Sequence, residues 1–199
     1  MKEHIEHYYQ YDPKWKDVPL GPHTLGTQGC LVTCLAMLSH VTGHRMNPKQ
    51  MRDELILRGG LLPDGLVSWN GINQIPLLHW LERNRTDNFR KEEAIRRVNR
   101  LIDMGIPVCV HVDNVASDSR PDHWVLMVGK FGEEMNMYDP WHGKGTFEAM
   151  YGEPEEELYG WSVIIGPSMA DAPDKRSLKA TYKILEGRHS EAVSHLINP

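Results

Sequence analysis

The sequence predicts an α+β fold in which N-terminal helices pack on a C-terminal antiparallel sheet. Two observations support this prediction. Apolar residues recur at helical spacing in the first half of the 199-residue chain, whereas the alternation of apolar and polar residues typical of half-buried strands dominates the second half. The two kinds of segment are not interleaved, as they would be in a parallel α/β protein, so segregated helices and strands are expected.

The N-terminal half begins with an irregular segment, and two helices follow it. Residues 1–29 are interrupted repeatedly by Pro and Gly, which predicts extended chain and turns. Residues 30–41 are apolar on nearly every side, a composition typical of a buried helix. A second helix is expected after Asn47, which can cap it, with Pro48 in its first turn and Gly59 at its end.

The middle of the chain predicts a loop and two further helices. Residues 61–72 contain Pro, Gly and Trp and are expected to form the loop, and residues 73–84 are expected to form a short helix. Residues 89–105 show a charged amphipathic pattern, with apolar residues on one face and Gly105 at the end.

Strands are expected from residue 107 onward. Alternation places Val108, Val110 and Val112 on one face of the first strand. Cys109 and His111 lie on the other face, where His111 is expected to meet solvent. The expected strands cover residues 107–113, 123–129, 134–138 and 161–165.

The chain is expected to hold one domain and an appendage. Residues 1–167 contain the strong helix and strand signals and suffice for a substantial core. Residues 168–199 are polar and form a C-terminal extension to which no role is assigned. Within it, residues 178–185 suggest a strand and residues 190–197 a helix.

Composition excludes several classes of function. Lys and Arg number 22 and Asp and Glu number 27, and the net charge of −5 argues against a nucleic-acid partner held by phosphate contacts. No apolar run reaches the roughly 20 residues of a transmembrane helix, and the N-terminus lacks the apolar core of a secretory signal. We therefore expect a cytoplasmic protein, released to the cell wall only by a separate route. Three cysteines are too few for a disulfide framework.

Three residues suggest a nucleophile, a base and a group that orients the base. Cys30 follows Gly29 at the start of the buried helix, where free backbone N–H groups and the helix dipole favour a thiolate. His123 begins one strand and Asp139 ends the next, so antiparallel pairing would bring their side chains together.

Other uses of these residue types are weaker. Cys34 and Cys109 suit the core as small apolar residues. A zinc site is not expected, because one continuous helix would hold Cys30 and His40 about 15 Å apart. Its four ligands would be Cys30, Cys34, His40 and His44. The predicted chemistry needs neither a metal nor an organic cofactor.

Five sequence blocks occur in the order found in a known group of enzymes. They are YYQYDPKW, GC followed by LVTCLAML, GIPVCVHV, DHWVLMVG and YDPWHG, spread over about residues 7–145. This order resembles papain-like cysteine peptidases of the double-glycine (bacteriocin) leader peptidase type, and is most similar to their soluble, stand-alone leader-peptidase-like group. The resemblance implies a papain-like fold with Cys30 as nucleophile, His123 as general base and Asp139 as its orienting partner.

The resemblance also implies an oxyanion hole and a substrate groove. The group uses an early Gln as oxyanion donor, and Gln10 occupies the matching block, while Gln28 beside the nucleophile is its rival. The backbone N–H of Cys30 would be the second donor. The candidates for substrate binding are Gln28, Gly29, Trp124 and Trp141. Such Trp side chains more often belong to the core or its shell than to a substrate groove.

The predicted function is hydrolysis of peptide or amide bonds by a cysteine hydrolase. The true leader peptidases of this group are fused to membrane transporters, and this sequence has no transmembrane segment, so bacteriocin export is not expected. Soluble members suggest a phage or bacterial endopeptidase that degrades peptidoglycan. The alternatives left open are an intracellular or effector protease, acyl transfer to an amine, and a catalytically silent peptide-binding module of the same fold.

Overall fold

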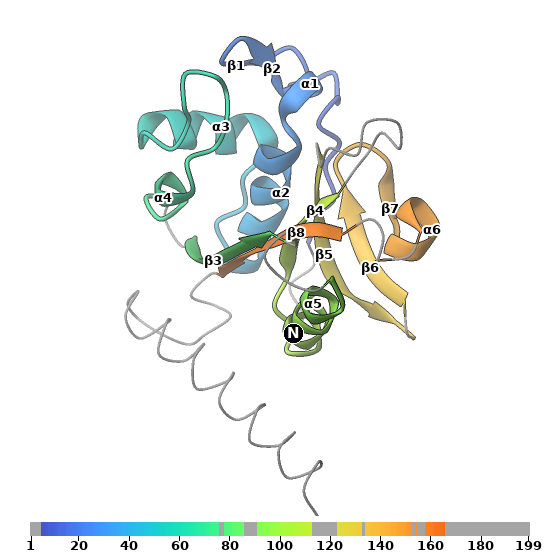
Figure 1. The fold of residues 1–199 in the computed structure, drawn as a ribbon. Coiled ribbons are helices and arrows are strands. Elements are labelled where there is room, and N and C mark those ends of the chain that lie inside the picture. Colours follow the sequence, from blue (N-terminus) through green and yellow to red (C-terminus); the bar gives the residue numbers. More distant parts are fainter. Residues whose placement is uncertain are drawn as a thin grey trace, which may run out of the picture.

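The structure is a computed structural model that describes most of the chain up to the last predicted strand. The described residues are 5–75, 78–85, 91–112, 123–132, 134–152, 154 and 158–165. Figure 1 shows the N-terminal helices gathered on one side of a sheet and α5 on the other side. The expected α+β, papain-like arrangement, with N-terminal helices on a C-terminal antiparallel sheet, is confirmed.

The N-terminal segment contains regular elements that the sequence does not predict. β1 (Pro19–Leu20) and β2 (His23–Thr24) form a short antiparallel hairpin, and α1 (Leu25–Gln28) follows directly. The hairpin turns at Gly21, whose φ of 61° suits glycine. A Cβ on Gly21 would lie only 2.5 Å from the backbone nitrogen of Gly65. The loop that contains Gly65 therefore packs tightly against this hairpin.

The two helices predicted next are confirmed as α2 and α3. α2 (Cys30–Ser39) is buried along almost its whole length and continues into the 3₁₀ turn η1 (His40–Thr42). α3 (Pro48–Leu57) is capped by Asn47, whose side chain accepts a hydrogen bond from the Gln50 N–H at 2.9 Å. The Gln50 side chain accepts one from the Asn47 N–H in return. These two bonds satisfy N–H groups that the helix itself leaves without partners.

Two predictions for the middle of the chain are wrong. Residues 61–72, expected to be a loop, end in the short helix α4 (Trp69–Ile72). Residues 73–84, expected to be a helix, lead instead into the edge strand β3 (His79–Arg85). β3 pairs with β8 (Leu158–Ile165), which lies far away in the sequence. Local periodicity cannot reveal a partner that is so distant in the sequence. Pairing with β8 overrides the helical preference that the sequence around β3 shows locally.

The predicted amphipathic helix is confirmed as α5 (Lys91–Asp103). Its buried side chains include Ala94, Val98 and Leu101, which belong to the same core cluster as one face of the sheet. Gly105, with φ of 76°, follows its end as expected. The apolar face of α5 therefore covers one face of the sheet, and α2 packs on the other face.

The main sheet has six antiparallel strands in the order β3-β8-β4-β5-β6-β7. Its other strands are β4 (Val108–Val112), β5 (His123–Phe131), β6 (Glu134–Asp139) and β7 (Gly143–Thr146). The four predicted strands are confirmed, whereas β7 and the helix α6 (Phe147–Tyr151) are not predicted. The strand and helix expected at 178–185 and 190–197 lie outside the described residues.

The sheet separates two apolar cores. The three valines of β4 lie in the core that contains α5, whereas Cys109 and Leu126 lie in the core that contains α2. This division of the two faces of β4 is the one that the alternation predicts. The Cys34 thiol of α2 donates to the Trp124 carbonyl of β5 at 3.4 Å, which ties the helix to the start of that strand.

Candidate active site

Cys30 is the first residue of α2 and is held by a tight junction with α1. The Gly29 N–H donates to the Leu25 carbonyl at 2.9 Å, and a Cβ on Gly29 would lie only 2.3 Å from that oxygen. Glycine therefore lets the chain pass directly from one helix into the next. The Cys30 side chain is half-buried at the helix N-terminus, where free N–H groups and the helix dipole attract negative charge.

His123 and Asp139 lie at the ends of the neighbouring strands β5 and β6. The register of the two strands, continued by one residue, puts Asp139 opposite Val125 and on the same face as His123. His123 Nε2 donates to Asp139 Oδ1 at 2.8 Å, and both side chains are buried. This bond leaves Nδ1 of His123 free of Asp139, and Cys30, which lines the same cleft, raises the pKa of His123.

The contacts between His123 and Asp139 favour the charged form of each side chain. Burial lowers the pKa of His123, but hydrogen bonds with Asp139 and Cys30 outweigh burial and raise this pKa to about 10. Burial raises the pKa of Asp139, but the hydrogen bond and the charge of His123 outweigh it, so this pKa lies below its usual value. Each side chain therefore favours the charged form of the other, while Cys30 adds to the shift of His123, and Tyr151 and Trp141 add to that of Asp139.

Three further groups hold Asp139. The Trp141 N–H donates to Oδ1 at 2.6 Å, and the Tyr151 hydroxyl donates to Oδ2. His7 Nε2 donates to the backbone carbonyl of Asp139 at 2.7 Å. Neither His7 nor Tyr151 is predicted from the sequence, because their contacts depend on how the N-terminal segment and α6 pack against β6. The nearest signal for His7 is its place just before the YYQYDPKW block.

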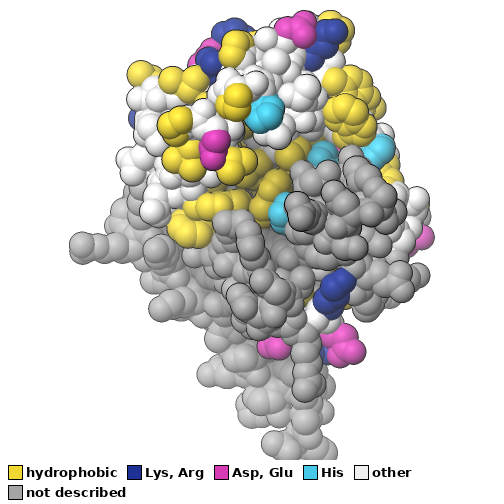
Figure 2. Space-filling model, turned by 45° about the horizontal axis from the view of Figure 1, so that its top comes forward, with side chains coloured by type: hydrophobic (Ala, Val, Ile, Leu, Met, Phe, Trp, Pro, Cys, Tyr) yellow, Lys and Arg dark blue, Asp and Glu magenta, His cyan; other side chains and the backbone are white. Residues whose placement is uncertain are grey.

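A cleft of about 570 Å³ opens over these residues. Figure 2 shows hydrophobic side chains gathered in and around a hollow on this face. The cleft brings together most residues predicted for the site, namely Gln10, Gln28, Cys30, His123, Trp124 and Trp141. Gly29 is buried and is not among the described residues that line it. The described residues that line the cleft include no Asp, Glu, Lys or Arg.

Gln10 and Gln28 both line the cleft, but they differ in how they are held. Gln10 is buried, with its backbone N–H donating to the Pro140 carbonyl at 2.9 Å and its Nε2 donating to the Gly26 carbonyl at 3.1 Å. The Gly26 carbonyl fixes the orientation of the amide, because the reverse orientation would set two oxygens against each other. Among the described residues, Nε2 makes no second hydrogen bond, and Oε1 is buried without a partner. Gln28 is exposed at the end of α1.

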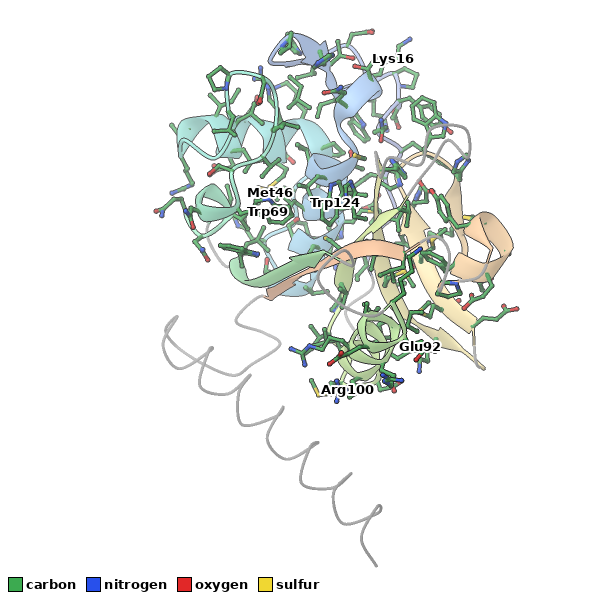
Figure 3. All side chains as sticks on the ribbon, viewed as in Figure 1. Lys16, Met46, Trp69, Glu92, Arg100 and Trp124 are labelled. Atoms are coloured by element: carbon green, nitrogen blue, oxygen red, sulfur yellow. The ribbon has the colours of Figure 1, made fainter. Side chains whose placement is uncertain are left out.

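Trp124 and His111 form a stacked pair in the cleft. Their rings are 4.4 Å apart and inclined by 12°, and Trp124 also packs against Trp69 at 5.4 Å (Figure 3). Trp124 is nearly buried: it packs in the core that contains α2 and also lines the cleft. Trp141 is 41% exposed. His111, expected to face solvent, instead lies half-buried in the cleft, because it stands opposite Trp124 in the β4–β5 ladder.

Cys34 and Cys109 are buried, as expected of core residues. Burial raises the pKa of Cys34, which keeps it a thiol. His40 is also buried; its Nδ1 accepts a hydrogen bond from the Glu6 N–H and its Nε2 lies 3.0 Å from the Tyr8 hydroxyl. This ring therefore anchors the N-terminal segment to the end of α2. In the described part of the chain, no group of three or more His, Cys, Asp or Glu side chains could hold a metal ion.

One cleft therefore contains a half-buried thiol at a helix start and a buried imidazole that is hydrogen-bonded to a buried carboxylate. The chain belongs to the Peptidase_C39 like family, whose family model matches residues 2–159. The matched range contains every residue predicted for the site. No curated protein matches the chain. Within the described ranges, no helix has the length and apolar character that crossing a membrane requires.

Proposed function

We propose that this protein hydrolyses peptide bonds with Cys30 as nucleophile, His123 as general base and Asp139 as the residue that orients His123. One observation carries the proposal: an imidazole that is hydrogen-bonded to the buried Asp139 carboxylate lines the same cleft as Cys30. Membership of the family supports cysteine peptidase activity in general. The three individual roles are the proposal.

Each turnover begins with His123 as an imidazolium that already holds the proton of the Cys30 thiol. The sulfur attacks the carbonyl carbon of the scissile bond, which forms a C–S bond and a tetrahedral oxyanion. As the oxyanion collapses, the C–N bond breaks and His123 delivers its proton to the leaving amine, so a thioester remains. His123 then takes a proton from water while the water oxygen attacks the thioester. The C–S bond breaks, and the sulfur regains its proton through His123.

Gln10 is the proposed oxyanion donor. Its amide is buried, is held by the Gly26 carbonyl and keeps one N–H for the cleft. Together with the Cys30 backbone N–H, it meets the developing negative charge without reorganisation, which is what makes such donors effective. Gln28 is the rival because it also lines the cleft, but an exposed side chain loses more conformational freedom when it binds.

The proposed substrate is an uncharged, extended peptide segment. The described lining residues carry no carboxylate, ammonium or guanidinium group, and Leu66, Val67 and Trp141 provide apolar walls. The resemblance to stand-alone leader-peptidase-like proteins suggests a phage or bacterial peptidoglycan endopeptidase. For that role the cleft favours an uncharged cross-bridge over a stem peptide with carboxylates. The alternative is an intracellular or effector protease that cuts an uncharged segment of an unfolded protein.

Incubation of the purified protein with labelled casein and, separately, with peptidoglycan tests the proposal. Released fragments are identified by mass spectrometry, with Cys30→Ala in parallel and Cys34→Ala as the matched control. We expect the wild type and Cys34→Ala to release fragments from at least one substrate, and Cys30→Ala to release none.

Three other outcomes contradict the proposal in different ways. Cleavage by Cys30→Ala overturns the assignment of the nucleophile. Binding of peptides by the wild type without any cleavage identifies a silent binding module. Fragments joined to an added amine, in place of free carboxylates, identify acyl transfer.

A further inference from the structure

Helix α6 contacts strand β6 near both of its ends. The Glu148 carboxylate accepts a hydrogen bond from the Met135 N–H, with distances of 3.3 and 3.2 Å to its two oxygens. At the other end of α6, the Tyr151 hydroxyl donates to Oδ2 of Asp139 at 2.5 Å. Met135 lies at the start of β6 and Asp139 at its end. The helix therefore fixes the strand that carries the carboxylate.

Core packing sets the position of α6. Phe147 is fully buried in the core that contains α5, and its ring lies 5.6 Å from that of Tyr151. Met150 packs so closely on Gly145 of β7 that a Cβ there would lie 2.4 Å from the Met150 side chain. The Tyr151 hydroxyl thus reaches Asp139 from a helix that is held on two sides.

Asp139 needs a donor at its second oxygen because the residue is completely buried. Oδ1 accepts from His123 Nε2 and from the Trp141 N–H, whereas Oδ2 accepts from the Tyr151 hydroxyl. A carboxylate held at one oxygen can turn about its Cβ–Cγ bond, since that torsion is broad. A carboxylate held at both oxygens keeps its plane, and with it the direction of Oδ1 toward His123.

We propose that Tyr151 is a positioning residue for the reaction and acts on His123 through Asp139. The inference rests on the proposed function, in which His123 is the base. While the carboxylate stays ionised and in plane, His123 keeps its Nε2–H toward Asp139 and presents Nδ1 to Cys30. Tyr151 is not among the described residues that line the cleft, so it acts without belonging to the substrate groove.

The hydroxyl also affects the charge of Asp139. Burial raises the pKa of Asp139, His123 lowers it, and the hydrogen bond from Tyr151 lowers it further. The other titratable groups around this carboxylate and its Tyr partner, among the described residues, include His7, Cys34, His123, His142 and Lys144. Substitution of Tyr151 leaves all five in place, so a change in the titration of Asp139 reports the lost hydroxyl.

The test compares Tyr151→Phe with Tyr138→Phe. Phe keeps the ring and its packing and removes only the hydroxyl. Tyr138 is the matched control because it precedes Asp139 on β6 but packs against the opposite core. For each variant, kcat and KM are measured across the pH range with a fluorogenic peptide copied from a site cut in labelled casein. The rate at which iodoacetamide alkylates Cys30 is measured over the same range.

We expect Tyr151→Phe to lower kcat by about tenfold to a hundredfold, the usual worth of a hydrogen bond to a charged group, and to leave KM nearly unchanged. The acid limb should move to higher pH in the pH profile of kcat and in that of Cys30 alkylation. The reason is that Asp139 loses a group that lowers its pKa, so it takes up a proton at a higher pH. Tyr138→Phe should match the wild type. A fluorinated tyrosine at position 151, whose phenol is more acidic, should move the limb to lower pH.

Two results overturn the inference. The first is that the pH profiles of Tyr151→Phe coincide with those of the wild type. The second is that Tyr138→Phe loses as much kcat as Tyr151→Phe does, which indicates a general effect of packing. If Tyr151→Phe fails to fold by circular dichroism, the fluorinated variant, which keeps the hydroxyl, decides. Failure of the proposed function can be distinguished from failure of this inference, because the wild type then cuts no peptide. The alkylation profiles still report whether Tyr151 acts on the Cys30–His123–Asp139 group.

Discussion

Cys30 and Cys34 show how one helical turn separates an accessible thiol from a buried one. Cys30 is half-buried at the cleft, whereas Cys34 is enclosed and donates to the Trp124 carbonyl, and burial raises its pKa. We expect iodoacetamide to label Cys30 before Cys34 or Cys109 in the folded protein, as measured by mass spectrometry of proteolytic peptides. Earlier labelling of either buried cysteine would show that Cys30 is not the nucleophile.

Asp139 orients His123 and makes no bond to the substrate in the proposed reaction. Asp139→Ala should therefore lower kcat, by up to about 10⁴-fold, and leave measurable turnover, whereas Cys30→Ala should abolish it. In Asp139→Asn the alkaline limb of kcat/KM, expected near pH 10 from the pKa of His123, should move to lower pH because a group that raises this pKa is lost. Total loss in Asp139→Ala with the fold intact would instead indicate a direct chemical role for the carboxylate.

The same pair makes stability depend on pH. The pKa of His123 is raised from 6.5 to about 10, so its contribution is fully present below pH 6.5 and is lost as the pH rises toward 10. The pKa of Asp139 is lowered from 3.8, so its contribution is present above pH 3.8 and is lost as the pH falls further. The difference in Tm between the wild type and Asp139→Asn should be largest between these limits, at about pH 4 to 6.5. Thermal unfolding at a series of pH values measures it, and a difference independent of pH contradicts the charged pair.

Gln10 and Gln28 can be separated by their effect on turnover. Gln10→Ala should lower kcat by about 10²–10³-fold, the usual cost of removing one oxyanion donor. Gln28→Ala should cost much less, because its exposed side chain is not held in place by a backbone carbonyl as the amide of Gln10 is. The reverse order of the two variants would transfer the oxyanion role to Gln28 and leave the other three assignments standing.

At the scale of elements, the junction between α1 and α2 fixes the place of the nucleophile. In Gly29→Ala a Cβ would lie 2.3 Å from the Leu25 carbonyl oxygen, so one of the two helices must shift and Cys30 with it. We expect a lower Tm, from an overpacking cost of about 1–3 kcal/mol, and slower alkylation of Cys30. Gly129→Ala is the control, because its Cβ would meet nothing within 4 Å. Equal behaviour of the two variants would mean that the junction does not position Cys30.

Elements that carry their own local signals could be predicted from the sequence. α3 has the Asn47–Pro48 start, α5 has a charged face and an apolar one, and β4 alternates strictly. β3 lacks such a signal because its identity as a strand depends on pairing with β8. α6 is only five residues long, which is too short for periodicity to show.

The same distinction applies to the site. Cys30, His123 and Asp139 stand at the boundaries of strong elements and within sequence blocks, so they could be predicted. Tyr151 lies in α6, and its role depends on where that helix packs, which no local pattern contains. Alternation along β4 predicts the face on which His111 lies, but its position in the cleft follows from the side chain of Trp124 opposite it.

At the scale of the whole molecule, β8 completes the domain. It lies between β3 and β4, although it comes from the last described residues. We expect a chain that ends at residue 167 to fold and to keep its activity, and a chain that ends at residue 157 to lose the cooperative unfolding transition, since it lacks an interior strand. Circular dichroism and Cys30 alkylation measure both. Loss of activity in the longer chain would show that residues 168–199 belong to the working peptidase.

The interior position of β8 in the sheet also determines when, during synthesis, the candidate site can be assembled. During translation, Cys30 and its helix leave the ribosome well before residues 158–165 do. Until those residues emerge, the sheet lacks the strand between β3 and β4, and His123 and Asp139 lack the finished scaffold that sets them beside the thiol. In the proposed reaction, the nascent chain therefore carries Cys30 before its partners are assembled, and we expect peptide cleavage to begin only after residues 158–165 have joined the sheet.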